Sequence, residues 1–216
     1  MSSFADSAQV LLWYETSGRE DGAPYRDPRD PGGFTKWGVS SRYHPDADVP
    51  NLTRLEALEL YRVRYWLRFG VGQLDNQQVA TICFLAVVNP GFRAASRALQ
   101  RACRATISAT GSAVQVPEAD GIMGPLTVAA ANALPSEILG AAYRCEVARE
   151  FSERIIENPA KAVFERGWMA RSMLDGLPRE LRELLRNGER AREAAAHVVR
   201  VEPAPGEPGS EGEGME

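Results

Sequence analysis

The chain is organised around residues 11–39, which read LLWYETSGREDGAPYRDPRDPGGFTKWGV. This stretch begins as an apolar helix, delivers a carboxylate at Glu15 and then becomes rich in glycine, proline and aspartate. Its helical part extends back to residue 4, because four residues share the spacing of one helix face. They are Phe4, Ala8, Leu11 and Glu15. We expect this face to point inward and to take Glu15 with it.

Burial would change the acidity of Glu15. Removal from water disfavours the ionised carboxylate and raises its pKa. A general acid that works near neutral pH needs such a shift. The alternative is a solvated glutamate at a helix end, and the periodicity alone leaves both interpretations open.

The residues after this helix favour turns. Glycine, proline and aspartate dominate residues 18–30, and Gly32-Gly33 permits a tight bend. Residues 34–40 then alternate enough to predict one short strand of a hairpin. A helix that ends in a glutamate would thus be followed by a small β-structure.

The rest of the chain reads as helices. Thr53 and Glu56 have the form of a capping box, and an apolar helix over 77–88 is stopped by Asn89-Pro90-Gly91. Further helices are expected over 92–106, over 126–133 and from Ser136 to about residue 157. For the last of these we expect an inner face of Ile138, Ala142, Cys145, Ala148, Phe151 and Ile155.

The predicted helix over 92–106 carries a stripe of arginines on one face. They are Arg93, Arg97, Arg101 and Arg104. A solvated surface is the plain interpretation. The alternative is that the stripe binds carboxylates of peptidoglycan stem peptides or anionic phosphates of the envelope.

Composition limits the possible partners. The formal net charge is -4, but five glutamates and no basic residue follow Arg200, so the remaining chain carries +1. We therefore expect no nucleic-acid partner. No apolar run approaches the length of a membrane span, and no secretory signal peptide is recognisable. We expect synthesis in the cytoplasm, no stable membrane insertion and a monomer.

The cysteines indicate neither a metal site nor a disulfide framework. Cys83, Cys103 and Cys145 are odd in number and widely spaced. We expect three buried, reduced thiols and no metal.

Six segments carry a resemblance to a known family. Residues 27–40, DPRDPGGFTKWGVS, are similar to the signature of glycoside hydrolase family 108, the N-acetylmuramidases of bacteria and phages that cut peptidoglycan. Five further segments follow in the family's order. They are YRVRYW (61–66), VNPG (88–91), LQRA (99–102), DGIMGPLT (120–127) and GWMAR (167–171). The resemblance spans roughly residues 5–175.

The resemblance implies a mainly α fold. A lysozyme-like helical catalytic core with a small β-hairpin, residues 1–91, would pack against a helical peptidoglycan-binding region, residues 92–176. A charged helix over 177–200 and a disordered acidic tail over 201–216 would follow.

It also implies site residues. By resemblance, Glu15 is the general acid, and Asp30 and Thr35 face it across a cleft. The expected substrate-binding residues are Tyr65 or Trp66, as a stacking partner of a sugar ring, and Asn89. The arginine stripe, which does not depend on the resemblance, adds Arg97 and Arg101. No cofactor is implied.

The sequence departs from the family next to the expected acid. The family commonly reads Glu-Gly-Gly-Tyr, whereas Glu15 is followed by Thr16-Ser17-Gly18, so Glu20-Asp21-Gly22 competes for the same alignment. We favour Glu15 because a rigid helix can fix both the position and the pKa of a carboxyl group. Glu20 lies in a glycine-rich loop.

Three functions follow from these observations. The leading hypothesis is a muramidase that cleaves the β-1,4 bond between N-acetylmuramic acid and N-acetylglucosamine. We expect it to be a phage or prophage endolysin that binds glycan strands and reaches the wall through a holin or another delivery system. The alternatives are a non-catalytic wall-binding or virion structural protein and a helical scaffold that binds nucleic acid.

Overall fold

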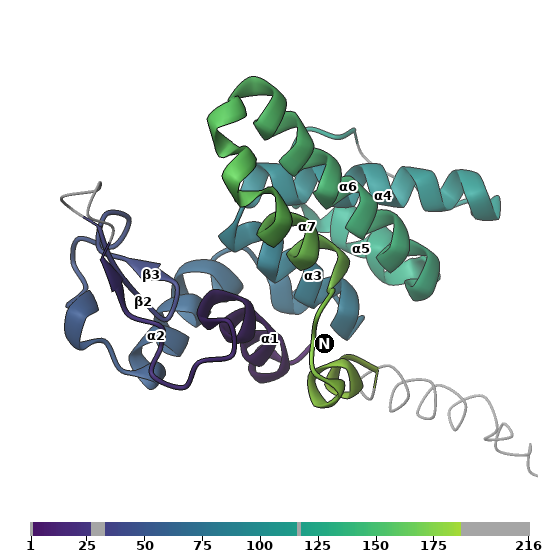
Figure 1. The fold of residues 1–216 in the computed structure, drawn as a ribbon. Helices are drawn as coiled ribbons and strands as arrows, with labels where there is room; N and C mark the ends of the chain where they lie inside the picture. Colours follow the sequence, from purple (N-terminus) through teal and green to yellow (C-terminus); the bar gives the residue numbers. More distant parts are fainter. Residues whose placement is uncertain (1, 27–32, 116–117, 187–216) are drawn as a thin grey trace, which may run out of the picture.

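The computed structural model describes residues 2–26, 33–115 and 118–186, and this part of the chain is mainly helical (Figure 1). Its α-helices are α1 (Phe4–Thr16), α2 (Arg54–Tyr61), α3 (Gln77–Val88), α4 (Phe92–Thr110), α5 (Pro125–Ala133), α6 (Ser136–Glu157) and α7 (Glu165–Met173). Short helical turns are η1 (Val49–Asn51), η2 (Arg62–Leu67), η3 (Val71–Gln73) and η4 (Pro159–Phe164). The strands are β1 (Tyr25–Arg26), β2 (Phe34–Lys36) and β3 (Val39–Ser40).

Helix α1 is fixed to α3 by a buried polar network. The Ser3 side chain caps the helix by accepting a hydrogen bond from the Asp6 amide. The Gln77 side-chain amide donates to the Ser3 carbonyl at 3.1 Å and to Ser7 Oγ at 2.9 Å. Ala8 and Leu11 are buried as predicted. Glu15, at the other end of α1, therefore stands on a rigid support.

A small antiparallel sheet follows α1. Strand β2 pairs with β3 and with β1, which confirms a small β-hairpin. Residues 34–40 nevertheless form two short strands around a turn at residues 37–38, and not the single strand predicted. The prediction of turns alone over 18–30 was wrong at β1, where Tyr25 is in register with Thr35. Tertiary pairing with a neighbouring strand outweighed local turn propensity here.

Trp37 fixes the hairpin to the helices. Its indole Nε1 donates to the Leu52 carbonyl at 3.1 Å, and the Tyr61 hydroxyl donates to the Trp37 carbonyl at 3.1 Å. The Trp37 amide donates to the Gly22 carbonyl at 2.7 Å. The turn of the hairpin is therefore held between the loop after α1 and helix α2.

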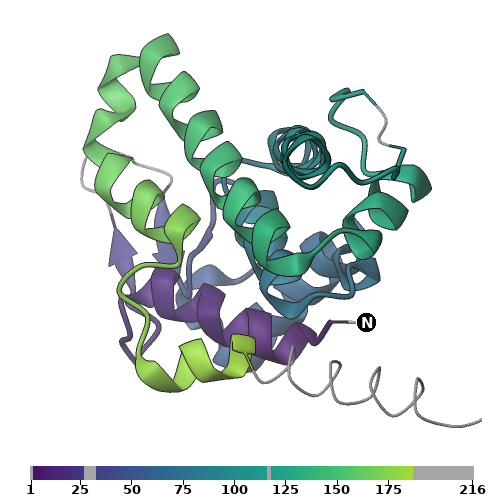
Figure 2. The ribbon, with the colours of Figure 1, turned by 90° about the vertical axis from the view of Figure 1, so that its right-hand side faces the viewer.

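The second half of the chain is built on α4 and α6. The buried Tyr143 hydroxyl of α6 donates to the Ala95 carbonyl of α4 at 3.0 Å. In Figure 2, α6 leads away from α1, the chain reverses through η4, and α7 returns alongside α6 toward α1. This reversal brings the end of the second half onto the first helix.

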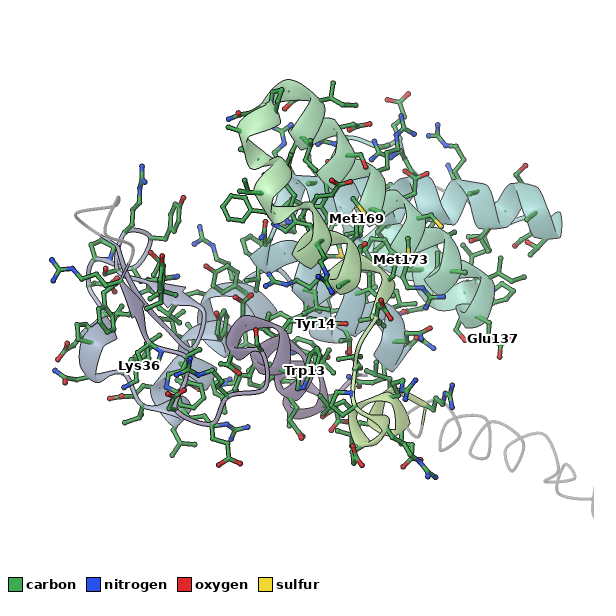
Figure 3. The ribbon with its side chains drawn as sticks, in the orientation of Figure 1. Trp13, Tyr14, Lys36, Glu137, Met169 and Met173 are labelled. Atoms are coloured by element: carbon green, nitrogen blue, oxygen red, sulfur yellow. The ribbon has the colours of Figure 1, made fainter. Side chains whose placement is uncertain are left out.

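Tyr14 of α1 holds the end of α7. Its hydroxyl lies 3.3 Å from the Ala170 carbonyl and 2.8 Å from the Asp175 carbonyl. Figure 3 shows Tyr14 on α1 next to α7, which carries Met169 and Met173. The two helices are therefore fixed relative to each other.

The predicted inner face of α6 was wrong by about one residue. Leu139, Tyr143 and Val147 are buried with Phe151, whereas Cys145 is exposed. Ala141 is exposed and Ala142 and Ala148 are half-buried, so apolar character alone did not mark the inner face. The packing of the buried Tyr143 on α4 decided the register. Cys83 and Cys103 are buried as expected, which raises the pKa of each thiol to about 12.

Some predicted helix boundaries agree with the structure and others do not. Helix α3 and the capping box of Thr53 and Glu56 are confirmed, whereas α4 continues to Thr110, four residues beyond its predicted end. A helix begins at residue 179 and continues to 186, the last described residue. The rest of the expected charged helix and the acidic tail lie outside the described residues.

Candidate active site

Glu15 borders a cavity of about 820 Å³. It lies in the last turn of α1, and its side chain is 14% exposed. The cavity is walled by the hairpin, by the segment from α2 into η2, by the end of α3 and by the η4–α7 segment. The residues lining it include Glu15, Thr35, Gly38, Ser40, Tyr43, His44, Tyr61, Tyr65, Asn89, Phe164, Trp168 and Arg171.

The hairpin approaches Glu15 as closely as a backbone can. Gly38 has a φ of 77°, and a Cβ atom at this position would lie 2.5 Å from Glu15 Cγ. Only glycine fits such a backbone conformation and such a contact without strain. The carboxyl group is thus enclosed on the hairpin side.

Arg171 of α7 encloses Glu15 from the other half of the chain. Its Nη1 lies 3.0 Å from Glu15 Oε1, and the Arg171 side chain is 16% exposed. The pair joins α1 to α7 across the cavity. Glu15 is therefore a half-buried carboxyl group with one cationic partner, Arg171.

Burial dominates the acidity of Glu15. Its pKa is raised because burial disfavours the charged form, while the charge of Arg171 and its hydrogen bond lower it by less. Burial and the nearby Glu15 charge also raise the pKa of Tyr61 well above its ordinary value. The carboxyl group can therefore hold a proton at higher pH than an exposed glutamate.

A polar chain orients Tyr65 on the neighbouring wall. Arg64 Nη1 lies 2.9 Å from His44 Nδ1, and His44 Nε2 lies 3.2 Å from the Tyr65 hydroxyl. A guanidinium can only donate, so Nδ1 accepts, and the neutral imidazole donates from Nε2 to Tyr65. Burial and the Arg64 charge lower the pKa of His44, in keeping with this neutral form. The hydrogen of the Tyr65 hydroxyl is then available to a group in the cavity.

Several predicted site residues meet at the cavity. Thr35, Tyr65 and Asn89 line it together with Glu15. Asp30 lies outside the described residues. Trp66 does not reach the cavity, because its ring is 5% exposed and packs edge-to-face against Phe4 and Phe84. The expectation that Trp66 could stack on a sugar ring was therefore wrong, and Trp66 packs in the core instead.

Arg97 and Arg101 lie away from the cavity. Arg97 Nη2 is 2.9 Å from Glu150 Oε2, and Arg101 Nε is 2.7 Å from Glu146 Oε2. Arg101 also pairs with Glu150. These contacts join α4 to α6, and a role of the two arginines in binding the wall stays a prediction.

Glu20, the competing acid, lies elsewhere. It is exposed in the loop after α1 and borders a separate hollow with Trp13 and Trp37. It is absent from the described residues that line the cavity of Glu15. The geometry thus supports the choice of Glu15.

The sequence reasoning missed Arg171, although it singled out the segment that contains it. Trp168 and Arg171 are three residues apart and therefore share a helix face, and both line the cavity. This spacing was the available signal. The sequence around His44 carried no such signal, because its partners Arg64 and Tyr65 are 20 or more residues away in the chain.

Two absences hold for the part of the chain that the structure describes. No group of histidine, cysteine and acidic side chains there could hold a metal ion. None of the described helices combines the length and the apolar character required to cross a bilayer.

The described residues thus have a mainly α, lysozyme-like fold in which a half-buried carboxyl group borders a large cavity. Residues 15–91 match the family described as Glycosyl hydrolase 108, and residues 94–173 match the family described as Predicted Peptidoglycan domain. Residues 15–91 therefore form a glycosyl hydrolase 108 domain, and residues 94–173 form a peptidoglycan-binding domain fused to it. It is a glycoside hydrolase that acts on peptidoglycan.

A solved structure shares this fold. The structure of Brucella abortus SagA matches with a TM-score of 0.57 and 20% sequence identity, over 86% of this chain and 92% of that chain. At this identity the likeness supports the fold alone. No curated protein matches the chain.

Proposed function

We propose that the protein is an N-acetylmuramidase, which hydrolyses the β-1,4 bond between N-acetylmuramic acid and N-acetylglucosamine. The observation that carries the proposal is the Glu15 carboxyl group, half-buried, raised in pKa and facing a cavity of about 820 Å³. Cleavage of a glycosidic bond needs a proton for the leaving oxygen. Glu15 is the group that supplies it.

The second requirement is stabilisation of the positive charge on the sugar and delivery of water. Glu15 is the single carboxylate among the described residues that line the cavity. The Thr35 hydroxyl and the Asn89 amide face the same space and can orient a water molecule. Asp30, which precedes β2 in the sequence, remains our candidate for the second carboxylate.

Aromatic side chains suit the cavity to a glycan. Tyr43 and Phe164 are exposed large side chains on opposite walls, one after the hairpin and one at the end of η4. Sugar rings have apolar faces that pack on aromatic rings, while their hydroxyl and acetamido groups need polar partners. Both kinds of group line this cavity.

The test compares two glutamates that the sequence alone could not separate. Glu15→Gln keeps the size of the side chain but removes the transferable proton, so we expect a loss of activity of about 10²–10⁴-fold. Glu20→Gln is the matched control and should keep wild-type activity. The measurements are turbidity loss on exposed peptidoglycan and mass spectrometry of the products, after both variants are shown to be folded.

The products decide between the proposed enzyme and its rival. New reducing-end muramic acid must appear with the wild-type protein. Binding to sacculi without such ends would favour the non-catalytic wall-binding protein, and activity retained by Glu15→Gln would contradict the assigned acid.

We also propose that the enzyme acts as an endolysin. The support is the resemblance of its hydrolase segment to muramidases of bacteria and phages. Co-expression with a holin in a bacterial host should then cause lysis, whereas either protein alone should not. Lysis without a holin would indicate another route to the wall.

A further inference from the structure

The ion pair between Glu15 and Arg171 crosses from one family-matched region to the other. Glu15 opens the glycosyl hydrolase segment, and Arg171 lies near the end of the peptidoglycan domain. Two adjacent contacts join the same helices, since Tyr14 donates to the Ala170 carbonyl and Glu15 pairs with Arg171. The peptidoglycan domain thus forms one wall of the catalytic cavity.

The environment of Arg171 is unlike that of an arginine placed for stability. Its Nε atom is buried and has no acceptor among the described residues. Arg101, in contrast, donates from Nε to Glu146 and from Nη2 to Glu150. An unpaired buried donor is destabilising, so packing alone does not account for the placement of Arg171.

The geometry divides the two oxygens of Glu15 between different neighbours. Oε1 accepts from Arg171, which can only donate, so this oxygen is occupied as an acceptor. Oε2 lies on the hairpin side, 2.7 Å from where a Cβ atom of Gly38 would be. Oε1 is thus the oxygen that contacts the cation, and Oε2 is the oxygen next to the hairpin.

We propose that Arg171 is a positioning residue for the general acid, supplied by the peptidoglycan domain, and that the active site is complete only with this domain. The proposal rests on the function assigned to Glu15. Arg171 fixes the rotamer of the carboxyl group through its contact with Oε1 and so holds the acid at the border of the cavity. Its charge also offsets part of the effect of burial, so that Glu15 can release its proton.

The test uses the full chain with three substitutions. Arg171→Gln removes the charge, Arg171→Lys keeps the charge but not the planar guanidinium, and Arg166→Gln is the control. Arg166 lies on the same helix and is exposed. The readouts are kcat, the pH profile of kcat/KM on peptidoglycan, and the titration of the Glu15 carboxyl carbon by NMR without substrate.

The sign of the pH effect follows from the charge. Loss of a nearby cation raises the pKa of a carboxyl group, so in Arg171→Gln the alkaline limb of kcat/KM and the Glu15 titration should both move to higher pH. We expect kcat to fall about tenfold or more, because a misplaced catalytic group costs that much or more. Arg171→Lys should restore the pH limb but not kcat, and Arg166→Gln should change neither.

The outcomes separate this proposal from the function itself. An unchanged pH limb and Glu15 titration in Arg171→Gln, with Glu15→Gln inactive, would overturn the role of Arg171 and leave the muramidase in place. If Glu15→Gln stays active, the assigned acid fails, whatever Arg171 does. Should Arg171→Gln not fold, an unchanged kcat in Arg171→Lys would overturn the positioning role.

Discussion

Glu150, which is buried, and Glu15, which is half-buried, both pair with arginines across helices, yet their surroundings differ. Glu150 of α6 is 4% exposed and contacts both Arg97 and Arg101 of α4. Glu15 of α1 is 14% exposed, pairs with Arg171 and borders the large cavity. The first is enclosed by two cations, and the second faces one cation and open space.

The difference shows what makes a buried carboxyl group reactive. Two guanidinium groups compensate the desolvation of Glu150 with charge and hydrogen bonds. A single guanidinium compensates Glu15 incompletely, and its pKa stays raised. Burial alone therefore does not define a catalytic acid. A catalytic acid is defined by the balance between burial and countercharge, together with access to the substrate.

The largest effect that would sharpen this comparison is on folding stability. Glu150→Gln removes a buried carboxylate that contacts both Arg97 and Arg101. Arg101 keeps its contact with Glu146 and Arg97 is partly exposed, so we expect a loss of about 3 kcal/mol in the free energy of unfolding, the low end of the range for a broken buried ion pair. Activity per folded molecule should stay near wild type, the reverse of Glu15→Gln. Chemical denaturation and turbidity assays measure the two quantities. A stable but inactive Glu150→Gln protein would break the distinction.

A second substitution tests how closely the hairpin encloses the acid. Gly38→Ala places a methyl group against Glu15 and forces alanine into a positive φ. We expect a destabilisation of about 1–3 kcal/mol and a clear fall in kcat, because the carboxyl group must move. Gly111→Ala is the control, since Gly111 also has a positive φ but an added Cβ meets nothing within 4 Å. Equal effects in both proteins would show that strain alone is responsible.

The smallest expected effect concerns the outer wall of the cavity. Phe164 is 56% exposed and forms the end of a stack with Trp168 and the buried Phe151. Phe164→Ala should raise KM several-fold and leave kcat nearly unchanged. The rise in KM corresponds to about 1 kcal/mol of binding free energy lost with the ring contact. Ile156→Ala, at an exposed position that does not line the cavity, should behave as wild type. A fall in kcat alone would contradict a binding role.

Local sequence patterns were enough to predict those elements whose structure depends on residues close together in the chain. The periodicity over 4–15, the capping box at Thr53 and the alternation over 34–40 each act within a few residues. They predicted α1, the start of α2 and the hairpin, and the resemblance supplied the expected acid. The sequence did not predict the inner face of α6 or the burial of Trp66 in the core. Both depend on which distant helix each side chain contacts.

What the sequence determined by itself was the set of elements and the identity of one carboxyl group at the end of a helix. Its motif order also indicated the two families. Only the tertiary structure decided that Arg171, 156 residues after Glu15, stands against it, and that Gly38 closes the opposite side. The physical reason is that desolvation and countercharge act through space over a few ångströms. No pattern along the chain encodes them until the helices have packed.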